Sequence, residues 1–384
     1  MLEGESIICF AHDWESDPTS KTHIMSILSR RNRVLWVSSI GMRRPSATPA
    51  DLARMASKLR RCLSGARRAA PNLIVANPIA IPLPGFPPAD RLNAALLAGW
   101  LRRLCRRHGL SRPILWTYLP NIVRLAGRLG ERMLVYHCVD EYRAFKGVQR
   151  EAISRMEDEL LRRADLVLVS SETLRDERRR INPNTYFIPH GVDLAHFSRA
   201  LDTATPVPSD LASLPRPVVG FFGLIAEWVD LSLVRSVALA QPDWSIVLIG
   251  RVATDLAPLE GLSNVHLLGP RPYGELPSYC RGFDAGIVPF RMSELTLRAN
   301  PLKLREYLAA GLPVVSTPLP EVARYEGLVH LAAGETEFVA CLEEALARRT
   351  EADARRRVEA MRAEGWERRV EEISEILVPM LEAA

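Results

Sequence analysis

Short apolar runs alternate with segments of helical periodicity along most of the chain. Such runs, bounded by Gly, Pro or polar residues, are typical of strands buried in a sheet. In the first half we expect strands at Ser6–Ala11, Arg33–Ser39, Leu73–Ala76, Pro113–Tyr118, Met133–Cys138, Leu166–Ser170 and Tyr186–Ile188. Helical segments are expected between them at 21–31, 51–65, 89–108, 149–163 and 172–181. This alternation predicts an α/β domain built on a doubly wound parallel sheet.

The same alternation restarts after a polar segment that is rich in proline. Residues 198–217 contain Pro206, Pro208, Pro215 and Pro217, which predicts a linker. Beyond it the expected strands are Val218–Phe222, Ser245–Gly250, Val265–Leu268, Ala285–Pro289, Val314–Val315 and Val329–Leu331, with helices near 230–241, 275–281 and from 335 onward. We therefore expect two Rossmann-like parallel-sheet domains facing a cleft, with ligands at the carboxyl ends of the strands.

Composition narrows the class of protein. The chain has 384 residues, of which 47% are hydrophobic, yet no apolar stretch reaches the roughly 18 residues of a transmembrane helix. The polar start Met1–Ser6 leads directly into a strand, so no signal peptide is expected. Six scattered cysteines without a Cys-x-x-Cys motif argue against a zinc site or a disulfide scaffold. We expect a cytoplasmic protein.

The net charge of +5 conceals a strong asymmetry along the chain. Residues 1–200 carry 32 Lys/Arg and 19 Asp/Glu, whereas residues 201–384 carry 18 and 26. The segments 54–68 and 92–107 combine basic residues with apolar residues at helical spacing. Basic amphipathic helices bind anionic membranes, although these apolar faces could equally be ordinary packing faces beneath a solvated basic exterior. Nucleic acid is not expected, because the aromatic residues are not interleaved with the basic ones and no recognition motif is present.

One segment, 298–318, carries the most specific chemistry. Asn300 is a good helix N-cap, Pro301 suits the first helical position, and Gly311 suits the end of the helix. Lys303 and Glu306 are three residues apart and share one face of that helix. The helix N-terminus with Lys303 would hold phosphate, and Glu306 would accept hydrogen bonds from ribose hydroxyls. The alternative is a surface helix with an ordinary Lys/Glu pair.

A glycine follows the first strand of the second domain. Gly223, in Gly220-Phe221-Phe222-Gly223, would let the backbone approach a phosphate, although glycine also simply makes tight turns. The segment is not G-x-G-x-x-G, so a dinucleotide cofactor is not expected. No Asp-x-Asp follows a strand, so no metal is expected to hold the diphosphate; the helix N-terminus and Lys303 would replace it.

These segments resemble GT-B glycosyltransferases related to family 4. The similarity runs through about residues 186–325, and it is nearest to bacterial exopolysaccharide enzymes of the xanthan-type glucuronosyltransferase and teichuronic-acid-type branch. The resemblance implies a nucleotide-sugar donor, with UDP as the expected nucleotide, and a base-binding loop that contains Arg271 and Tyr273. Tyr273 could equally pack beneath Pro277. The implied domains are 1–197 for the acceptor and 218–364 for the donor, with a last helix, 365–384, crossing back to the first domain.

The family carries two glutamates eight positions apart, and this chain departs from that pattern. Arg298 occupies the position of the first, which argues for an inverting mechanism. Such a mechanism needs a general base. Asp140, at the end of the strand Met133–Cys138, is the candidate that the resemblance supports, with Glu141 in reserve. The alternative is that Asp140 caps the following turn.

Further candidates follow the first strand. Asp13 would bind or activate the acceptor, Trp14 would offer a sugar-stacking face, and Lys21 would favour an anion in the first turn of the next helix. Ordinary helix capping is the alternative.

Together these features predict a metal-independent hexosyl- or glycuronosyltransferase of bacterial exopolysaccharide biosynthesis. Its acceptor would be a glycan or a polyprenyl-diphosphate-linked glycan, and the protein would be peripheral at the inner face of the plasma membrane. The alternatives are a UDP-sugar epimerase on the same fold and a non-catalytic binder of membrane or nucleic acid.

Overall fold

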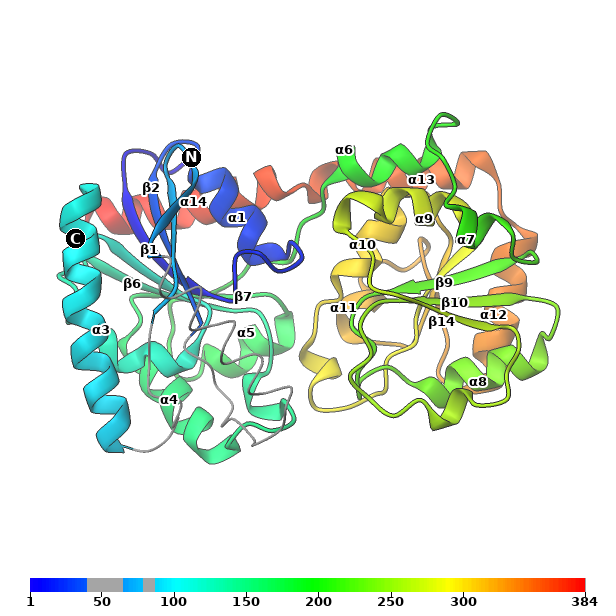
Figure 1. Ribbon diagram of the computed structural model, residues 1–384, viewed down its shortest axis with the longest axis horizontal. Coiled ribbons are helices and arrows are strands. Elements are labelled where there is room, and N and C mark those ends of the chain that lie inside the picture. Colours follow the sequence, from blue (N-terminus) through cyan, green and yellow to red (C-terminus); the bar gives the residue numbers. More distant parts are fainter. Residues whose placement is uncertain (40–64, 79–86, 384) are drawn as a thin grey trace. The chain divides into compact units, whose positions relative to one another are not determined.

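The computed structural model describes residues 1–39, 65–78 and 87–383 (Figure 1). The chain divides into two compact units. The first contains Met1–Pro189 and Arg369–Ala384, and the second contains His190–Arg368. The segment 198–217, expected as a linker, thus belongs to the second unit, where it includes α7 (Ser209–Ala212) and the buried Leu211. The chain from Arg369 onward belongs to the first unit.

The first unit is built on an eight-stranded sheet in the order β3-β4-β2-β1-β5-β6-β7-β8. All neighbours are parallel except β3 and β4, which are antiparallel. The strands are β1 (Ser6–Ala11), β2 (Arg33–Ser38), β3 (Arg67–Ala70), β4 (Leu73–Ala76), β5 (Ile114–Thr117), β6 (Met133–Cys138), β7 (Leu166–Val169) and β8 (Thr185–Phe187). Continuous apolar runs such as Ile114–Thr117 are buried on both faces, as a covered parallel sheet requires.

Helices cover both faces of this sheet. They are α1 (Ser20–Leu28), α3 (Pro87–His108), α4 (Arg150–Arg163), α5 (Glu172–Arg178) and α14 (Trp366–Glu382), with short 3-10 turns η1 (Pro120–Leu125) and η2 (Tyr142–Ala144). Figure 1 shows α1 and α14 along one face and α4 along the other. The buried side chains of α3, η1 and α4 form one core with alternate residues of the strands.

One sequence expectation about the two basic segments was wrong. Arg67 and Arg68, expected on a helix over 54–68, lie on the edge strand β3; residues 54–64 lie outside the described part of the chain. The edge of β4 offers unpaired backbone groups that β3 satisfies, and exposed arginines suit an edge strand. On α3, Leu92 and Leu96 are 49% and 62% exposed, because the helix turns another stripe, which includes Leu101, towards the sheet.

The second unit is built on a six-stranded, all-parallel sheet in the order β11-β10-β9-β12-β13-β14. The strands are β9 (Val218–Phe222), β10 (Ser245–Ile249), β11 (Val265–Gly269), β12 (Ala285–Val288), β13 (Val314–Ser316) and β14 (His330–Leu331). The helices are α6 (Leu194–Phe197), α7, α8 (Leu231–Ala240), α9 (Leu276–Gly282), α10 (Leu302–Ala309), α11 (Pro320–Ala323), α12 (Glu335–Ala347) and α13 (Glu351–Ala360). The 3-10 turns are η3 (Ser198–Leu201), η4 (Ala257–Leu259), η5 (Tyr273–Glu275), η6 (Thr296–Arg298) and η7 (Arg362–Glu364).

Helix α10 is tied closely to this sheet. The backbone amide of Phe222, at the end of β9, donates to the hydroxyl of Tyr307 over 3.0 Å. The ring of Tyr307 lies so near Gly286 of β12 that a β-carbon there would stand 2.8 Å from it. Glycine at position 286 therefore lets α10 approach the strands and brings its first turn to their carboxyl ends.

Among the described residues, none of the helices combines the length and the apolar character needed to cross a membrane.

Candidate functional site

Two glycines bring the loops after β9 and β10 together in the second unit. Gly223 has φ +133° and Gly250 has φ +146°, conformations that side chains rarely adopt. A β-carbon on Gly250 would lie 1.9 Å from the carbonyl oxygen of Gly223. A β-carbon on Gly223 would lie 3.2 Å from the Cε atom of Lys303. The two glycines thus allow a close backbone crossing directly beside the first turn of α10.

Lys303 is held over aromatic rings in this first turn. Its Nζ atom lies 5.0 Å from the ring centroid of Phe221 and 4.7 Å from that of Phe290, which is cation–π range. Burial lowers the pKa of Lys303 to about 8, and the nearby carboxylate of Glu306 partly offsets this effect. Burial also raises the pKa of Glu306 to about 7, again offset in part by Lys303.

Lys303 and Glu306 do not neutralise each other directly. Among the described residues, neither side chain forms a hydrogen bond or an ion pair within 4.0 Å, so the structure does not contain the ordinary surface pair considered from the sequence. A half-buried cation and carboxylate without direct partners favour a ligand that supplies complementary groups.

Tyr273 adjoins this cluster, whereas Arg271 does not. The ring of Tyr273 stacks on His196 at 4.5 Å, and burial, Glu306 and Asp193 raise the pKa of its phenol. The guanidinium of Arg271 is bound instead by Asp210, at 2.7 Å, and by the hydroxyl of Tyr279. The loop after β11 therefore contributes Tyr273 to the group around Glu306, while Arg271 fastens this loop to α7 and α9.

Asn300 is not the N-cap that the sequence suggested. Helix α10 begins at Leu302, and Pro301 occupies the cap position. The amide oxygen of Asn300 instead accepts a 2.5 Å hydrogen bond from Arg305, whose guanidinium also reaches Glu364 at 3.2 Å. Arg305 is only 1% exposed. This support of α10 was not expected from the sequence, although an arginine on the buried stripe of the helix could have indicated it.

In the first unit, Lys21 and Asp140 gather at the carboxyl ends of β1, β5 and β6. Burial raises the pKa of Asp140 to about 6, and Lys21 partly offsets this shift. Burial lowers the pKa of Lys21, with Asp140 acting in the opposite direction. The Nζ atom of Lys21 lies 5.8 Å from the ring centroid of Tyr118, and that ring stacks on His137 at 4.8 Å.

Several polar atoms around this cluster are buried without a hydrogen-bond partner among the described residues. They are the hydroxyl oxygens of Tyr118 and Tyr142, Nδ1 of His137, and both ring nitrogens of His12. Burial lowers the pKa of His12 to about 4 and that of His137 to about 3, with Lys21 adding to each shift, so both rings are neutral at pH 7. Neutral imidazoles and phenols that lack partners suit a ligand rich in hydroxyl groups.

A buried ion-pair network holds the loop that carries Asp140. Glu157 of α4 accepts from Arg143 at 2.6 Å and from the hydroxyl of Tyr136 at 2.9 Å. Arg178 of α5 reaches Glu157 at 3.3 Å and Glu141 at 2.8 Å. Glu141 thus forms part of a buried ion-pair network, and we no longer regard it as the reserve base. Sequence spacing gave no signal for this network, because its members come from separate elements.

Asp13 and Trp14 lie in different surroundings. They line a small hollow with Glu15, Arg67 and Asn77 beside β3 and β4. Trp14 packs edge-on against Trp36 at 4.9 Å. The structure therefore groups Lys21 with Asp140 and places Asp13 and Trp14 in a separate hollow. Among the described residues, no cluster of three or more His, Cys, Asp or Glu side chains that could hold a metal ion occurs.

Part of the chain is similar in sequence to known proteins. Residues 216–349 match the family model of glycosyl transferases group 1. Over 232 residues the chain is 30% identical to a putative teichuronic acid biosynthesis glycosyltransferase, TuaH, of Bacillus subtilis (strain 168). That alignment covers 56% of this chain and 58% of the relative, so the chain spans little more than half the length of the curated relative it matches.

Solved structures match over nearly the whole chain. Sucrose-phosphate synthase from Thermosynechococcus elongatus has a TM-score of 0.72 at 17% identity, covering 99% of this chain and all of that one. Anabaena HepE in complex with UDP and glucose has a TM-score of 0.69 at 14% identity, covering 97% and 99%. Trehalose 6-phosphate synthase from Burkholderia multivorans has a TM-score of 0.69 at 13% identity, covering 100% of each chain. The chain therefore has the GT-B fold, and its residues 216–349 are similar to the glycosyl transferases group 1 family.

Proposed function

We propose that this protein is a glycosyltransferase that moves a sugar from a nucleotide donor, UDP-linked, to a glycan or lipid-linked glycan acceptor in bacterial surface-polysaccharide biosynthesis. The observation that carries the proposal is the half-buried Lys303 and Glu306 beside Gly223, inside the segment that matches the family. The UDP and glucose bound by the HepE neighbour support the choice of donor. The teichuronic acid relative supports the choice of pathway class.

The donor site follows from the charges of the second unit. The backbone at Gly223, the start of α10 and the ammonium of Lys303 hold the diphosphate, because each presents positive charge or N–H groups. The carboxylate of Glu306 accepts from the ribose hydroxyls, and Tyr273 lies beside it. Asn300 acts indirectly by holding Arg305 of α10.

The first unit supplies the acceptor site and the base. Asp140 takes the proton of the acceptor hydroxyl as that oxygen attacks the anomeric carbon. The bond from the anomeric carbon to the diphosphate oxygen breaks, and the nucleotide diphosphate leaves with the electron pair. A pKa of about 6 leaves Asp140 ionised at neutral pH and basic enough to accept the proton. Direct displacement inverts the anomeric configuration.

Arg298 supports the inverting mechanism over retention. It occupies η6, eight positions before Glu306, and its guanidinium donates to the carbonyl oxygen of Glu294 over 2.9 Å. No carboxylate stands at this position to play the part of the family's first glutamate.

We also propose that the protein binds the anionic surface of a membrane, because its first 200 residues carry an excess of 13 positive charges.

The function is tested by measuring UDP release from UDP-glucose, UDP-glucuronate and UDP-N-acetylglucosamine, with and without a bacterial lipid extract as acceptor. Stimulation by the extract supports the transferase. Formation of the epimeric UDP-sugar without acceptor would show an epimerase instead. If calorimetry detects no binding of UDP, the proposal is wrong and a non-catalytic binder is favoured.

A further inference from the structure

A hollow lined by arginines lies in the first unit, away from the residues assigned above. It is bounded by α3, η1 and α4 and has a volume of about 380 Å³. Its charged side chains are Arg91, Arg124, Arg128, Arg163 and Glu159. Four guanidinium groups and a single carboxylate therefore line this hollow.

Among the residues that the structure describes, Arg163 is the one of these four arginines that forms an ion pair. Arg163 lies 3.4 Å from Glu159 and also donates to the carbonyl oxygens of Val123 and Ala126. Arg91, Arg124 and Arg128 form no ion pair with any residue that the structure describes. The Nε atom of Arg124 is buried and has no hydrogen-bond partner among the described residues. Three arginines that have no ion pair within the described part of the chain thus line one hollow.

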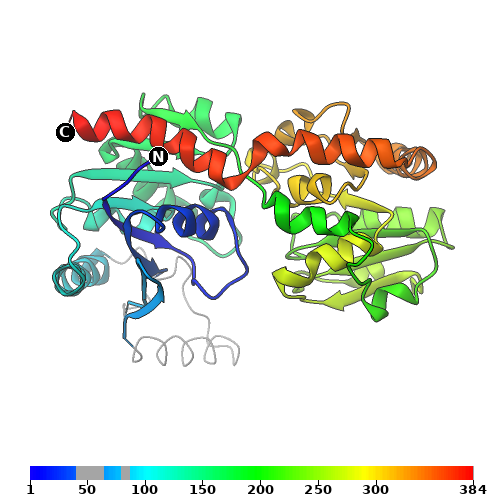
Figure 2. The same ribbon diagram turned by 90° about the horizontal axis from the view of Figure 1, so that it is seen from above.

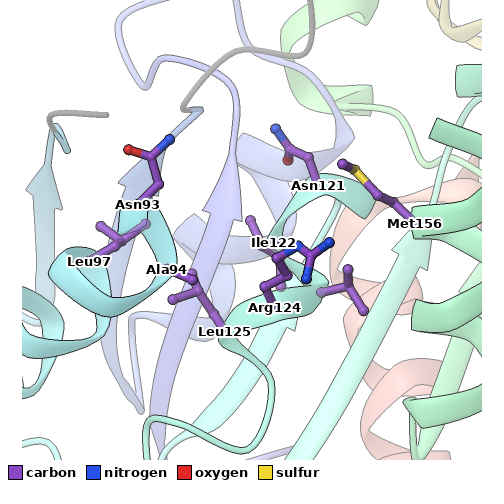
Figure 3. A pocket seen from close by; sticks show the side chains of 9 residues that line it. Asn93, Ala94, Leu97, Asn121, Ile122, Arg124, Leu125 and Met156 are labelled. Carbon is purple, nitrogen blue, oxygen red and sulfur yellow. The ribbon is translucent and has the colours of Figure 1, made fainter. Parts of the chain in front are cut away.

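Arg124 also lines a second cavity beside this hollow. This smaller cavity of about 30 Å³ is lined as well by Leu97 of α3 and Met156 of α4. Figure 3 shows Arg124 between Ala94 and Leu125 on one side and Met156 on the other. The fork of N–H donors on a guanidinium matches phosphate oxygens in geometry.

The outward face of α3 indicates where the phosphate comes from. Leu92 and Leu96 are exposed and lie one turn apart, next to Arg91. Arg102, Arg103, Arg106 and Arg107 continue along the exposed side of the same helix. In Figures 1 and 2, α3 lies at the margin of its unit. Exposed leucines beside exposed arginines complement an anionic lipid surface, which offers both acyl chains and phosphates.

We infer that the arginine hollow binds phospholipid headgroup phosphate while Leu92 and Leu96 enter the lipid surface, so that α3 docks the protein on an anionic bilayer. This inference rests on the proposed function only in its choice of a membrane as the site of action. Beyond that function, the inference names the residues that contact the membrane and places a phosphate site among them.

The test is co-sedimentation of the full chain with vesicles of phosphatidylglycerol and phosphatidylcholine, compared with phosphatidylcholine alone. Binding is expected only to the anionic vesicles. The double variant Arg91→Gln/Arg128→Gln should weaken it about tenfold or more. The double variant Leu92→Ser/Leu96→Ser should weaken it without changing the charge. Arg348→Gln/Arg355→Gln, which removes two exposed charges from the second unit, is the matched control and should bind as the wild type does.

Equal loss in the control variant would show that general charge alone attracts the vesicles and would overturn the inference, as would undiminished binding of both α3 variants. Retention of an RNA oligonucleotide, but not of vesicles, through the same arginines would identify nucleic acid as the partner and also overturn it. UDP release from UDP-sugar in solution, measured on the same variants, should be unchanged. A failure of lipid docking is thereby separated from a failure of the proposed transferase activity.

Discussion

Arg178 holds Glu141 in place, with 2.8 Å between Nη2 and the carboxylate oxygen Oε2. The adjacent carboxylate, Asp140, pairs with no arginine that the structure describes and lies near Lys21 instead. Two consecutive acidic residues therefore have different environments. Glu141 is anchored in a buried network, while Asp140 is left with a pKa near neutrality.

This contrast predicts opposite effects of two matched substitutions. Asp140→Asn should reduce transfer by at least about 100-fold, because removal of a general base typically costs 10²–10⁴. Its affinity for UDP should be unchanged. Glu141→Gln should leave a measurable rate but lower the free energy of unfolding by about 3 kcal/mol, because Arg178 loses one partner of a buried ion pair. Acceptor-dependent UDP release and urea denaturation measure the two effects. Full activity in Asp140→Asn would show that the base lies elsewhere.

The donor cluster predicts a bell-shaped pH dependence of UDP affinity. Glu306 must be ionised to accept from ribose hydroxyls, so affinity should rise as pH increases through about 7. Lys303 must be charged to attract the diphosphate, so affinity should fall as pH increases beyond about 8. Calorimetric titration with UDP between pH 6 and 9.5 measures the curve.

Each limb of that curve can be assigned by substitution. Lys303→Met should weaken UDP binding about 10- to 100-fold and remove the alkaline limb. Glu306→Gln should remove the acid limb. A wild-type affinity that does not vary across this range would contradict the assignment of both residues.

A third prediction concerns the glycine beside Lys303. Gly223→Ala should weaken UDP binding, because the new β-carbon meets the Cε atom of Lys303 at 3.2 Å in a backbone conformation that already disfavours alanine. Gly261→Ala is the matched control. Gly261 also has positive φ, +78°, but a β-carbon there has nothing within 4 Å. Both variants should lose some stability from backbone strain, of order 1–3 kcal/mol. Only Gly223→Ala should lose UDP affinity, as measured by calorimetry; equal affinities would remove Gly223 from the donor site.

Elements that are buried on all sides could be predicted from the sequence alone. Strands such as Ile114–Thr117 are buried on both faces and therefore appear as continuous apolar runs. The edge strand Arg67–Ala70 is exposed and carries no such run, so Arg67 and Arg68 were placed at the end of a helical pattern. On α3 the sequence offers two apolar stripes, and only the tertiary structure decides that the stripe of Leu101 is buried while Leu96 is exposed.

The candidate site could likewise be predicted only where its residues are close in sequence. Lys303 and Glu306 were found because their spacing places them on one helix face, which is a local property. The ion pair of Arg271 with Asp210 and the hydrogen bond of Arg305 to Asn300 join residues from separate elements. The partners Glu157 and Arg178 come from two helices. No periodicity predicts such pairs.

The last prediction concerns stability and follows from the sign of the shift at Asp140. Its pKa in the folded protein, about 6, lies above its ordinary value of 3.8. The folded state therefore binds this proton more tightly than the unfolded state, and the carboxyl group costs stability as pH rises from about 4 to above 6. Asp140→Asn removes that cost, so it should raise the free energy of unfolding at pH 7.5 by roughly 1–3 kcal/mol. At pH 4 the difference between variant and wild type should nearly vanish, because Asp140 is then protonated in the folded protein. Urea denaturation at the two pH values measures the effect. A variant that is less stable than the wild type at pH 7.5 would show that Lys21 compensates fully for the burial of Asp140, and the carboxylate would then be a structural partner of Lys21 in place of a base poised to accept a proton.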